Sequence, residues 1–476
     1  MSLKAKTLNG VKWTSISTIF VAAIQLLQLS ILARYLMPSD FGLLALVLLV
    51  IGFTRLFSDL GVSNAIIHKQ HTTHSQLSTL YWFNIIVSII LFLILIFLSP
   101  FIGDFYNESN LSYLINIASF SLIIQSLGKQ FFVLFEKELL FNLLAKIKIF
   151  SSLISFIVTV LLVVQGLGVM ALIIGVLIDS AILSILYIYN GLKIHKPGLI
   201  FNLKEVKDFI NFGLFNIGSN MINYFNSQMD VIIIGKLLGS ESLGVYSLVK
   251  QFIEAPTKII NPIILRVSFP VMSKVQHDIN KVKDIYLKII NYISSVSFPI
   301  YGLTFILSDE IVSIFLGEKW SNASEIMMIL SIYFMFRSIG NPIGSLILAM
   351  GKPQYEMYWN ISLFFYIPIV LYISSQWGII GISYSWIFIT ISLMIPNWYF
   401  LVNKLCGASF TSYFYIIIKV TIITTLSLLL SYLFYNYFDL FLIKIFGTLF
   451  VGTISTIIFN FIFNNEIIKM IKGILK

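Results

Sequence analysis

The sequence has few charged residues and a single cysteine. Charged side chains make up 11% of its 476 residues, against roughly 25% in a typical soluble protein. These charged residues are too few to cover the surface of a soluble chain of this length. We therefore expect the chain to be surrounded mainly by lipid. The one cysteine, Cys406, excludes an internal disulfide and a cysteine-based metal cluster. The sequence also lacks a phosphate-binding glycine loop, a metal-ligand helix and a nucleophile elbow, so we expect no enzyme, no bound metal and no cofactor.

Long apolar runs dominate what is present. Hydrophobic residues make up 58% of the chain and the mean hydropathy is +0.93. The runs have the ~20 residues of a spanning helix, whereas a β-barrel strand has ~10 alternating residues. The polar, basic start shows no small-residue cleavage site, so we expect no cleavable signal peptide. We therefore predict an all-α polytopic membrane protein with about fourteen transmembrane helices, at 11–36, 42–66, 77–100, 112–134, 142–164, 168–190, 208–236, 244–272, 284–307, 323–349, 355–376, 379–403, 412–436 and 440–463.

Three pairs of these helices are joined by very short predicted turns, at 37–40, 165–167 and 375–378. Lysines gather in alternate loops and acidic residues in the others. The positive-inside rule then places both termini in the cytoplasm, and it explains the formal charge of +10 better than nucleic-acid binding does. The basic segments 193–208, 273–288 and 464–476 look amphipathic and are expected along the anionic inner leaflet; ordinary solvated loops are the alternative.

An internal repeat divides the chain. Residues 33–42 resemble residues 235–244 in their cation, leucine, acidic turn and closing glycine. A second similarity links 109–128 with 321–340 at one constant spacing. Chance similarity between apolar helices is the alternative. The repeat predicts two parallel six-helix lobes related by an axis along the membrane normal: an N-terminal lobe (1–192), an amphipathic cytoplasmic linker (193–207), a C-terminal lobe (208–405), and two appended helices with a basic tail (406–476).

All four arginines lie within predicted helices, at Arg34, Arg55, Arg266 and Arg337. A charge at the bilayer centre costs ~2.5–3.5 kcal/mol on insertion scales, so it normally faces a cavity or a partner. The guanidinium group fits phosphate through two hydrogen bonds. With Lys250 and Lys258, these arginines predict a cationic chamber between the lobes that binds a phosphate or diphosphate.

Structural interpretations stand beside this one. Arg55 with Asp59, and Lys250 with Glu254, have the spacing of helical ion pairs, while Arg34 and Arg266 lie near helix ends where long side chains reach the interface. Two carboxylates without an obvious local partner, Asp179 and Asp230, suit a coupling cation or proton, or an arginine partner, which is favoured slightly. Histidines 68, 71 and 74 have a spacing that binds metal weakly, but a solvated loop is the preferred interpretation.

Several stretches resemble one family. They are Leu36-Met37-Pro38-Ser39-Asp40-Phe41-Gly42, Ser78-Thr79-Leu80-Tyr81-Trp82-Phe83-Asn84, Gln228-Met229-Asp230, Ile234-Gly235-Lys236-Leu237-Leu238-Gly239, Leu243-Gly244-Val245-Tyr246-Ser247-Leu248, Phe269-Pro270-Val271-Met272, Phe315-Leu316-Gly317-Glu318-Lys319-Trp320 and Ala349-Met350-Gly351-Lys352-Pro353. In this order they are similar to the Wzx-type flippases, especially the colanic and teichuronic acid exporters of the multidrug/oligosaccharidyl-lipid/polysaccharide exporter superfamily.

The resemblance implies a V-shaped fold of two lobes that open alternately to each side of the bacterial cytoplasmic membrane. It implies transport of undecaprenyl-diphosphate-linked oligosaccharide from the inner to the outer leaflet, for O-antigen or exopolysaccharide synthesis. The polysaccharide polymerase and chain-length machinery are expected partners. In related lipid II flippases, cations of the chamber receive the diphosphate and the last two helices hold the lipid tail. Arg55 and Arg337 are candidates for the first role by their placement alone.

Three alternatives remain. A multidrug or small-solute exporter of the same superfamily would favour an aromatic cavity of low charge. A major facilitator transporter would carry a Gly/Asp/Arg-rich loop between its second and third helices, which this sequence lacks. A membrane glycosyltransferase or polymerase would need acids in an outer loop, where the pair Asp309 and Glu310 is better explained as the cap of a short interfacial helix. The driving force would be a Na⁺ or H⁺ gradient or the membrane potential.

Overall fold

The computed structural model describes residues 3–58, 66–67, 72–464 and 466, and the regular elements in these ranges are all helical. Eleven helical segments of the described residues are long and apolar enough to cross a membrane. One of them, Gln354–Cys406, is 53 residues long and contains two of the predicted helices. The prediction of an all-α polytopic membrane protein is confirmed. The chain forms two compact units: unit 1 contains Met1–Leu248 and Leu363–Ser375, and unit 2 contains Val249–Ser362 and Gln376–Lys476.

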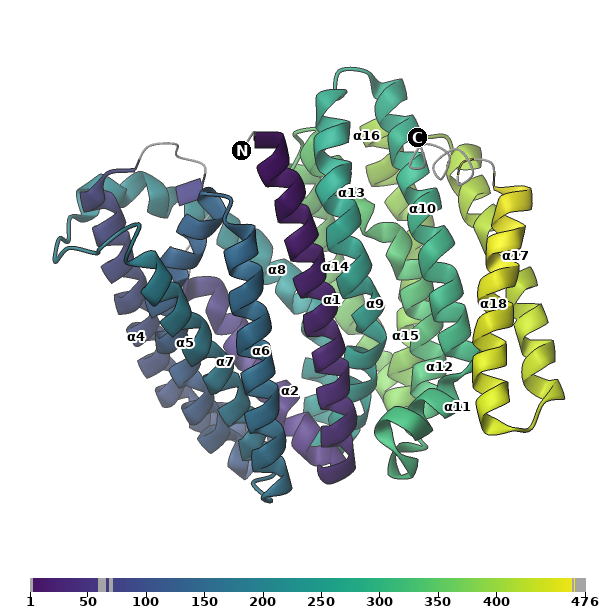
Figure 1. The fold of residues 1–476 in the computed structure, drawn as a ribbon, viewed down its shortest axis with the longest axis horizontal. Helices are drawn as coiled ribbons and strands as arrows, with labels where there is room; N and C mark the ends of the chain where they lie inside the picture. Colours follow the sequence, from purple (N-terminus) through teal and green to yellow (C-terminus); the bar gives the residue numbers. More distant parts are fainter. Residues whose placement is uncertain (1–2, 59–65, 68–71, 465, 467–476) are drawn as a thin grey trace. The chain divides into compact units, whose positions relative to one another are not determined.

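Unit 1 is built from long helices with short connections. They are α1 (Leu3–Tyr35), α2 (Pro38–Ser58), α4 (His74–Tyr106), α5 (Ser109–Lys137), α6 (Phe141–Val164), α7 (Val169–Gly191), the 3₁₀ turn η1 (Leu203–Val206), α8 (Lys207–Leu237) and the first turns of α9 (Gly239–Lys274). Helix α5 packs between α4 and α7, and α6 packs against α1 and α7 (Figure 1). The apolar faces of these helices are thereby buried against one another.

Two of the predicted turns behave differently. The turn between α6 and α7 is as short as expected, because Gly166 and Gly168 adopt positive φ angles of 86° and 55°. The predicted turn at 37–40 is instead the start of a helix, since α2 already begins at Pro38. A carboxylate oxygen of Asp40 accepts the backbone N–H of Met37 at 2.9 Å. This acidic residue therefore caps α2 and complements its dipole.

The two matched glycines of the repeat lie at one helix crossing in unit 1. A Cβ atom on Gly42 of α2 would overlap the carbonyl oxygen of Ser240, and one on Gly244 of α9 would overlap that of Pro38. The two backbones touch directly, which only glycine permits. The contact is reciprocal, because each glycine meets the backbone of the other copy of the motif.

The connection between α7 and α8 is docked on the start of α4. The indole N–H of Trp82 donates to the Gly198 carbonyl at 2.9 Å, and the Gly198 N–H donates to the Ser78 hydroxyl at 3.0 Å. A ring nitrogen of His74 lies 3.0 Å from the Lys196 carbonyl oxygen. His195 is 7% exposed beside His74. Burial, and then the neighbouring His74, lower the pKa of His195 below its ordinary 6.5.

Unit 2 contains the rest of α9 and most of the later helices. They are α10 (Ile279–Ile306), α11 (Ser308–Ile311), the π-helical η2 (Val312–Leu316), η3 (Glu318–Trp320), α12 (Ala323–Arg337), η4 (Ser338–Gly340), α13 (Pro342–Ala349), α14 (Gln354–Ser374, which also enters unit 1), η5 (Ser375–Trp377), α15 (Gly378–Asn397), the π-helical η6 (Trp398–Asn403), α16 (Lys404–Cys406), α17 (Phe410–Tyr437) and α18 (Phe441–Phe463).

One predicted helix contains a change of winding. The predicted helix 323–349 is confirmed as one apolar segment, Ala323–Ala349, and its winding changes through η4, because Pro342 has no N–H to continue the α-helical hydrogen bonds. The basic segment 273–288, expected along the inner leaflet, is partly helical: its residues from Ile279 onward are the first turns of α10.

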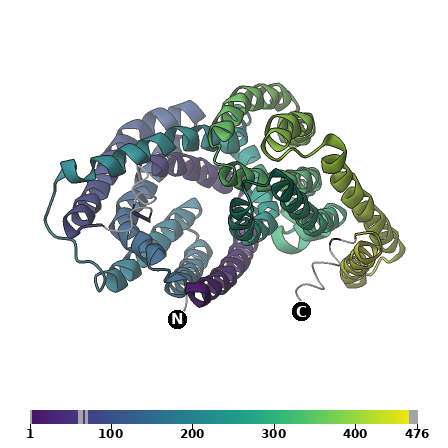
Figure 2. The ribbon, with the colours of Figure 1, turned by 90° about the horizontal axis from the view of Figure 1, so that it is seen from above.

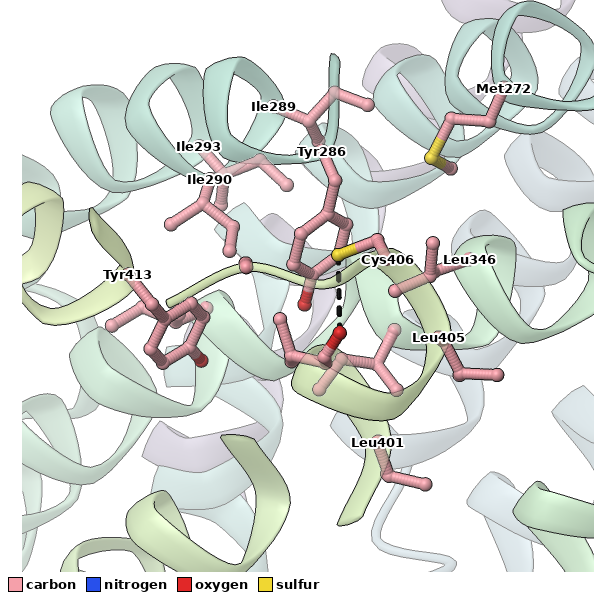
Figure 3. Packing of buried hydrophobic residues seen from close by; sticks show 14 of the residues in the cluster. Met272, Tyr286, Ile289, Ile290, Ile293, Leu346, Leu401, Leu405, Cys406 and Tyr413 are labelled. Carbon is pink, nitrogen blue, oxygen red and sulfur yellow. Dashed lines mark hydrogen bonds between the residues drawn. The ribbon is translucent and has the colours of Figure 1, made fainter. Parts of the chain in front are cut away.

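The core of unit 2 lies where α10 meets the segment that leads into α17. Tyr286, Ile290 and Ile293 of α10 are fully buried against Cys406 and Tyr413 (Figure 3). The thiol of Cys406 donates to the Val402 carbonyl oxygen at 3.2 Å. The buried cysteine therefore packs as a small apolar residue, and this packing fixes which face of α17 points inward.

Helices α17 and α18 form an antiparallel hairpin, seen side by side in Figures 1 and 2. The hairpin is joined to α11 by Glu310, which is 6% exposed. This carboxylate is 3.1 Å from the Lys444 ammonium and accepts the hydroxyl of Tyr435 at 2.8 Å. The expected short helix at Asp309 and Glu310 is present as α11. Glu310 serves there as a buried ion-pair partner.

Candidate functional site

Arg55 is the candidate cation of unit 1. It lies in the last turn of α2, within an apolar segment that is long enough to span a membrane. Its Nε atom is buried, and it has no hydrogen-bond partner among the described residues. A buried guanidinium donor without a partner is costly. Arg55 is thus placed to receive an anion or an ordered polar group.

Aromatic side chains pack around the part of α2 that carries this arginine. Tyr224 of α8 donates its hydroxyl to the Leu49 carbonyl oxygen at 2.7 Å. Gly52, which lies between Leu49 and Arg55, leaves room for that hydroxyl, since a Cβ there would come within 2.5 Å of it. The Phe53 ring lies 5.2 Å from that of Phe225, also on α8. Helix α8 thereby holds α2, and with it Arg55, in position.

Asp179 of α7 binds a lysine that the sequence analysis did not consider. Its carboxylate lies 3.0 Å from the Lys148 ammonium of α6 and accepts the Ser151 hydroxyl at 2.5 Å. The charges of Lys148 and Asp179 therefore balance each other.

Asp230 of α8 is fully buried and hydrogen-bonded. One carboxylate oxygen accepts the Tyr246 hydroxyl of α9 at 2.8 Å, and the other accepts the backbone N–H of Val231 at 2.9 Å. The bond from Tyr246 ties α8 to α9. The two bonds give Asp230 a structural role next to the glycine crossing.

Arg337 is the candidate cation of unit 2. It is the last residue of α12, where the helix changes its winding. Its guanidinium lies 5.6 Å from the ring centre of Tyr333 and 5.5 Å from that of Phe334. The Tyr333 ring is stacked on Trp386 at 5.1 Å. Arginine thus lies on a rigid aromatic surface.

Glu254 of α9 forms an ion pair. Its carboxylate lies 3.1 Å from the ammonium of Lys258, one turn later. Lys250, the partner that the sequence predicted, is also four residues from Glu254. Lys250 is half-buried and makes interactions of its own.

Of three other predicted site residues, one is exposed and two have side chains outside the described residues. Arg34 is exposed in the last turn of α1. The backbone of Arg266 lies in α9, but its side chain is outside the described residues, as is all of Asp59. His68 and His71 are also outside them. Within the described residues no group of three or more His, Cys, Asp or Glu could hold a metal ion.

Taken separately, each unit brings one arginine into a setting of aromatic side chains inside membrane helices. Such a setting can bind an anion without covalent chemistry. Sequence reasoning missed Lys148, Tyr224 and Trp386, which support the predicted residues. Lys148 carried a signal, because it is a lysine inside a predicted span. The two aromatic residues carried none in a chain with 15% aromatic residues.

Comparison with known proteins identifies the family. Residues 31–325 match the model of the polysaccharide biosynthesis protein family. The chain is 32% identical over 414 residues to the lipopolysaccharide biosynthesis protein WzxC of Escherichia coli, covering 87% of this chain and 84% of that protein. It is 32% identical over 426 residues to the teichuronic acid biosynthesis protein TuaB of Bacillus subtilis, covering 89% and 88%.

The fold is also known from solved structures. The lipid II flippase MurJ, in an inward closed conformation, aligns with a TM-score of 0.77 at 17% identity, covering 95% of this chain and 99% of that chain. The identity is low, so this likeness concerns the fold. The family of these relatives is one of transporters, which confirms the expectation that the chain is not an enzyme. This multi-pass membrane protein belongs to the polysaccharide biosynthesis protein family and is similar to its Wzx-type members.

Proposed function

We propose that the protein moves an undecaprenyl-diphosphate-linked oligosaccharide from the inner to the outer leaflet of the bacterial cytoplasmic membrane. Sugars and a diphosphate do not cross hydrocarbon unaided, whereas a prenyl chain can stay in lipid. An interior that binds the diphosphate and opens alternately to each side solves this problem without chemistry. The relatives named for lipopolysaccharide and teichuronic acid synthesis support a glycan as the cargo.

The observation that carries the proposal is the buried Nε of Arg55, which has no hydrogen-bond partner among the described residues. A diphosphate oxygen is a strong acceptor for such a donor, and arginine offers two parallel N–H groups to it. We assign Arg337 the same role in unit 2, with the aromatic rings beneath it excluding water. We keep Arg34, Arg266, Lys250 and Lys258 as further cations of the chamber.

The proposed architecture has fourteen transmembrane helices in two six-helix lobes, 1–192 and 208–405, in a V shape, with 406–476 appended. Helices α8 and α9, of 31 and 36 residues, coincide with the seventh and eighth predicted spans and support this number. The lysine-rich loops support cytoplasmic termini.

For the driving force we propose an ion gradient or the membrane potential, since an inward-negative potential helps to expel an anion. The carboxylates assigned to coupling or charge pairing are Asp59, Asp179, Asp230 and Glu254. Asp179 is the strongest of these, because it is half-buried and already holds a cation in Lys148. The polymerase and chain-length machinery are proposed partners.

The test is flipping of a fluorescent undecaprenyl-diphosphate glycan in proteoliposomes. Arg55→Gln and Arg337→Gln should each slow flipping by at least about tenfold, the loss expected for one charge-assisted hydrogen bond. Arg55→Lys should recover part of the rate, because it restores the charge but not the planar fork. Lys404→Ala, which removes an exposed lysine next to α17, is the matched control.

Normal flipping by both glutamine variants would assign the arginines to structure. A wild-type protein that exports a cationic dye and moves no lipid-linked glycan would replace the proposal with the multidrug exporter. Each variant is compared only after its elution from a size-exclusion column matches the wild type.

A further inference from the structure

The α17–α18 hairpin of unit 2 carries two lysines in contrasting environments. Lys444 lies 3.1 Å from the Glu310 carboxylate, and its ammonium is 3.8 Å from the ring centre of Tyr435. The charge of Lys444 is therefore paired with a carboxylate of the protein. Lys419, on α17, has no such carboxylate contact among the described residues: its ammonium donates to the neutral amide oxygen of Asn464 at 3.2 Å.

The depth of Lys419 makes this environment unusual. Lys419 is nine residues beyond Phe410, the first residue of α17, which places it roughly 14 Å along the helix. The helix is a candidate membrane span of 28 residues. An ammonium has three donors, and the one described bond uses one of them. A cation inside a span normally faces a partner, a cavity or a ligand.

A buried amide network holds the acceptor in place. The Asn464 side-chain N–H groups donate to Asn291 at 3.0 Å, Ser295 at 3.2 Å and Asn460 at 3.2 Å. The Asn291 amide in turn donates to the Asn464 oxygen at 2.9 Å. Asn291, Asn460 and Asn464 are at most 6% exposed. Because these bonds fix which side of the Asn464 amide is oxygen, the Lys419 ammonium has a preorganised position.

Charge and register favour an anion at this position. Lys288 is exposed on α10 three residues before Asn291, so it lies one turn away on the same helix face. Lys288 and Lys419 are therefore two cations on helices that the amide network joins.

The surroundings of Lys419 favour a lipid over a soluble anion. One helical turn away on α17 lie Tyr415 and Ile422, with exposed fractions of 66% and 55%, and Ile418 beside it is 56% exposed. These apolar side chains are suited to contact hydrocarbon chains. A basic position between membrane helices at the lysine-rich side is typical of binding sites for anionic headgroups.

We propose that Lys419, held by the Asn291–Asn464 amide network, binds the phosphate of a lipid headgroup at the junction of α10, α17 and α18. Two sources carry this chemistry: a phospholipid such as phosphatidylglycerol, and a polyprenyl phosphate. This site shares no residue with those proposed around Arg55 and Arg337, and its test measures binding alone. If the flipping proposal fails, the lipid site at Lys419 can still be present. If the lipid site is absent, the flipping proposal is unaffected.

The experiment is lipid retention by the purified full chain, measured by native mass spectrometry. Phosphatidylglycerol and undecaprenyl phosphate are titrated separately, with undecaprenol as the phosphate-free probe. Lys419→Met should weaken retention of a phosphate-bearing lipid about tenfold, the loss expected for a charge-assisted hydrogen bond. Lys419→Arg should retain it, and undecaprenol binding should not change.

Lys444→Met is the matched control in the same hairpin, and it should lower thermal stability without weakening lipid retention. Loss of undecaprenyl phosphate alone would support a carrier-lipid site, and loss of phosphatidylglycerol alone a phospholipid site. Unchanged retention of both lipids by Lys419→Met overturns the proposal and leaves Lys419 as a cap on the end of α18. Asn464→Leu, which removes the positioning amide, tests the same point if Lys419→Met fails to fold.

Discussion

The glycine crossing between α2 and α9 gives the sharpest stability prediction. A Cβ on Gly42 would overlap the Ser240 carbonyl oxygen and lie 2.7 Å from its carbon, and a Cβ on Gly244 would lie 2.5 Å from the Pro38 carbonyl carbon. Both obstacles are backbone atoms of helix starts, which cannot rotate away as a side chain can. Gly42→Ala must therefore push two helices apart, and overpacking of this kind costs about 1–3 kcal/mol.

The assay is the apparent melting temperature of the detergent-purified protein, followed by fluorescence-detected size-exclusion chromatography. Gly218→Ala is the matched control, because Gly218 is a helical glycine of α8 with nothing within 4 Å of its Cβ position. It should be neutral or stabilising by up to about 1 kcal/mol, since alanine favours the helix. Gly42→Ala and Gly244→Ala should each lower the melting temperature clearly below that of the control.

The double variant distinguishes a shared contact from two separate defects. Once Gly42→Ala has separated the helices, Gly244→Ala should cost little more. The double variant should therefore lose less stability than the sum of the losses in the two single variants. The reasoning fails if Gly42→Ala has the same melting temperature as Gly218→Ala. It also fails if the losses of stability caused by Gly42→Ala and Gly244→Ala are fully additive.

Three further perturbations have expected outcomes. Asp179→Asn leaves the half-buried Lys148 without its carboxylate and should lower stability by about 1–3 kcal/mol, measured as a fall in melting temperature. The pKa of His195 is lowered in the folded protein, so the unfolded chain binds more protons and stability should fall as the pH drops below 6.5; His195→Gln should remove that fall. Glu310→Gln removes the charge paired with Lys444 and should increase hydrogen exchange in α17 and α18.

The first of these has a control in the chain. Asp278→Asn breaks the exposed pair with Lys281 and should have the smaller effect on the melting temperature. A slope that survives His195→Gln would show that another group is responsible, and unchanged exchange in Glu310→Gln would mean that apolar packing alone holds the hairpin.

Most helices could be predicted because a membrane helix is marked by a long apolar run. The run at 142–164 corresponds to α6 (Phe141–Val164), and that at 440–463 to α18 (Phe441–Phe463). Composition cannot show how a helix begins or changes its winding. The first turn of α2 was therefore mistaken for a loop, and η4 within 323–349 was not predicted.

The partners of the charged residues were harder to predict than their positions. Asp179 pairs with Lys148, which is 31 residues away on a neighbouring helix, and only packing brings the two together. Glu254 has a lysine four residues away on either side, and its ion pair with Lys258 was not predicted. Lys419 was overlooked because one lysine in a long apolar run scarcely changes its hydropathy.

The docked connection between α7 and α8 bears on how this protein can be engineered. Residues 196–205 hydrogen-bond with α4 through five side chains, so a tag, reporter or chain break placed there would compete with folded structure. The α6–α7 turn offers a better position, because Gly166 and Gly168 have nothing within 4 Å of their Cβ positions. A split protein or an inserted fluorescent domain should be tolerated there, while a cut in the longer connection should weaken its docking on α4.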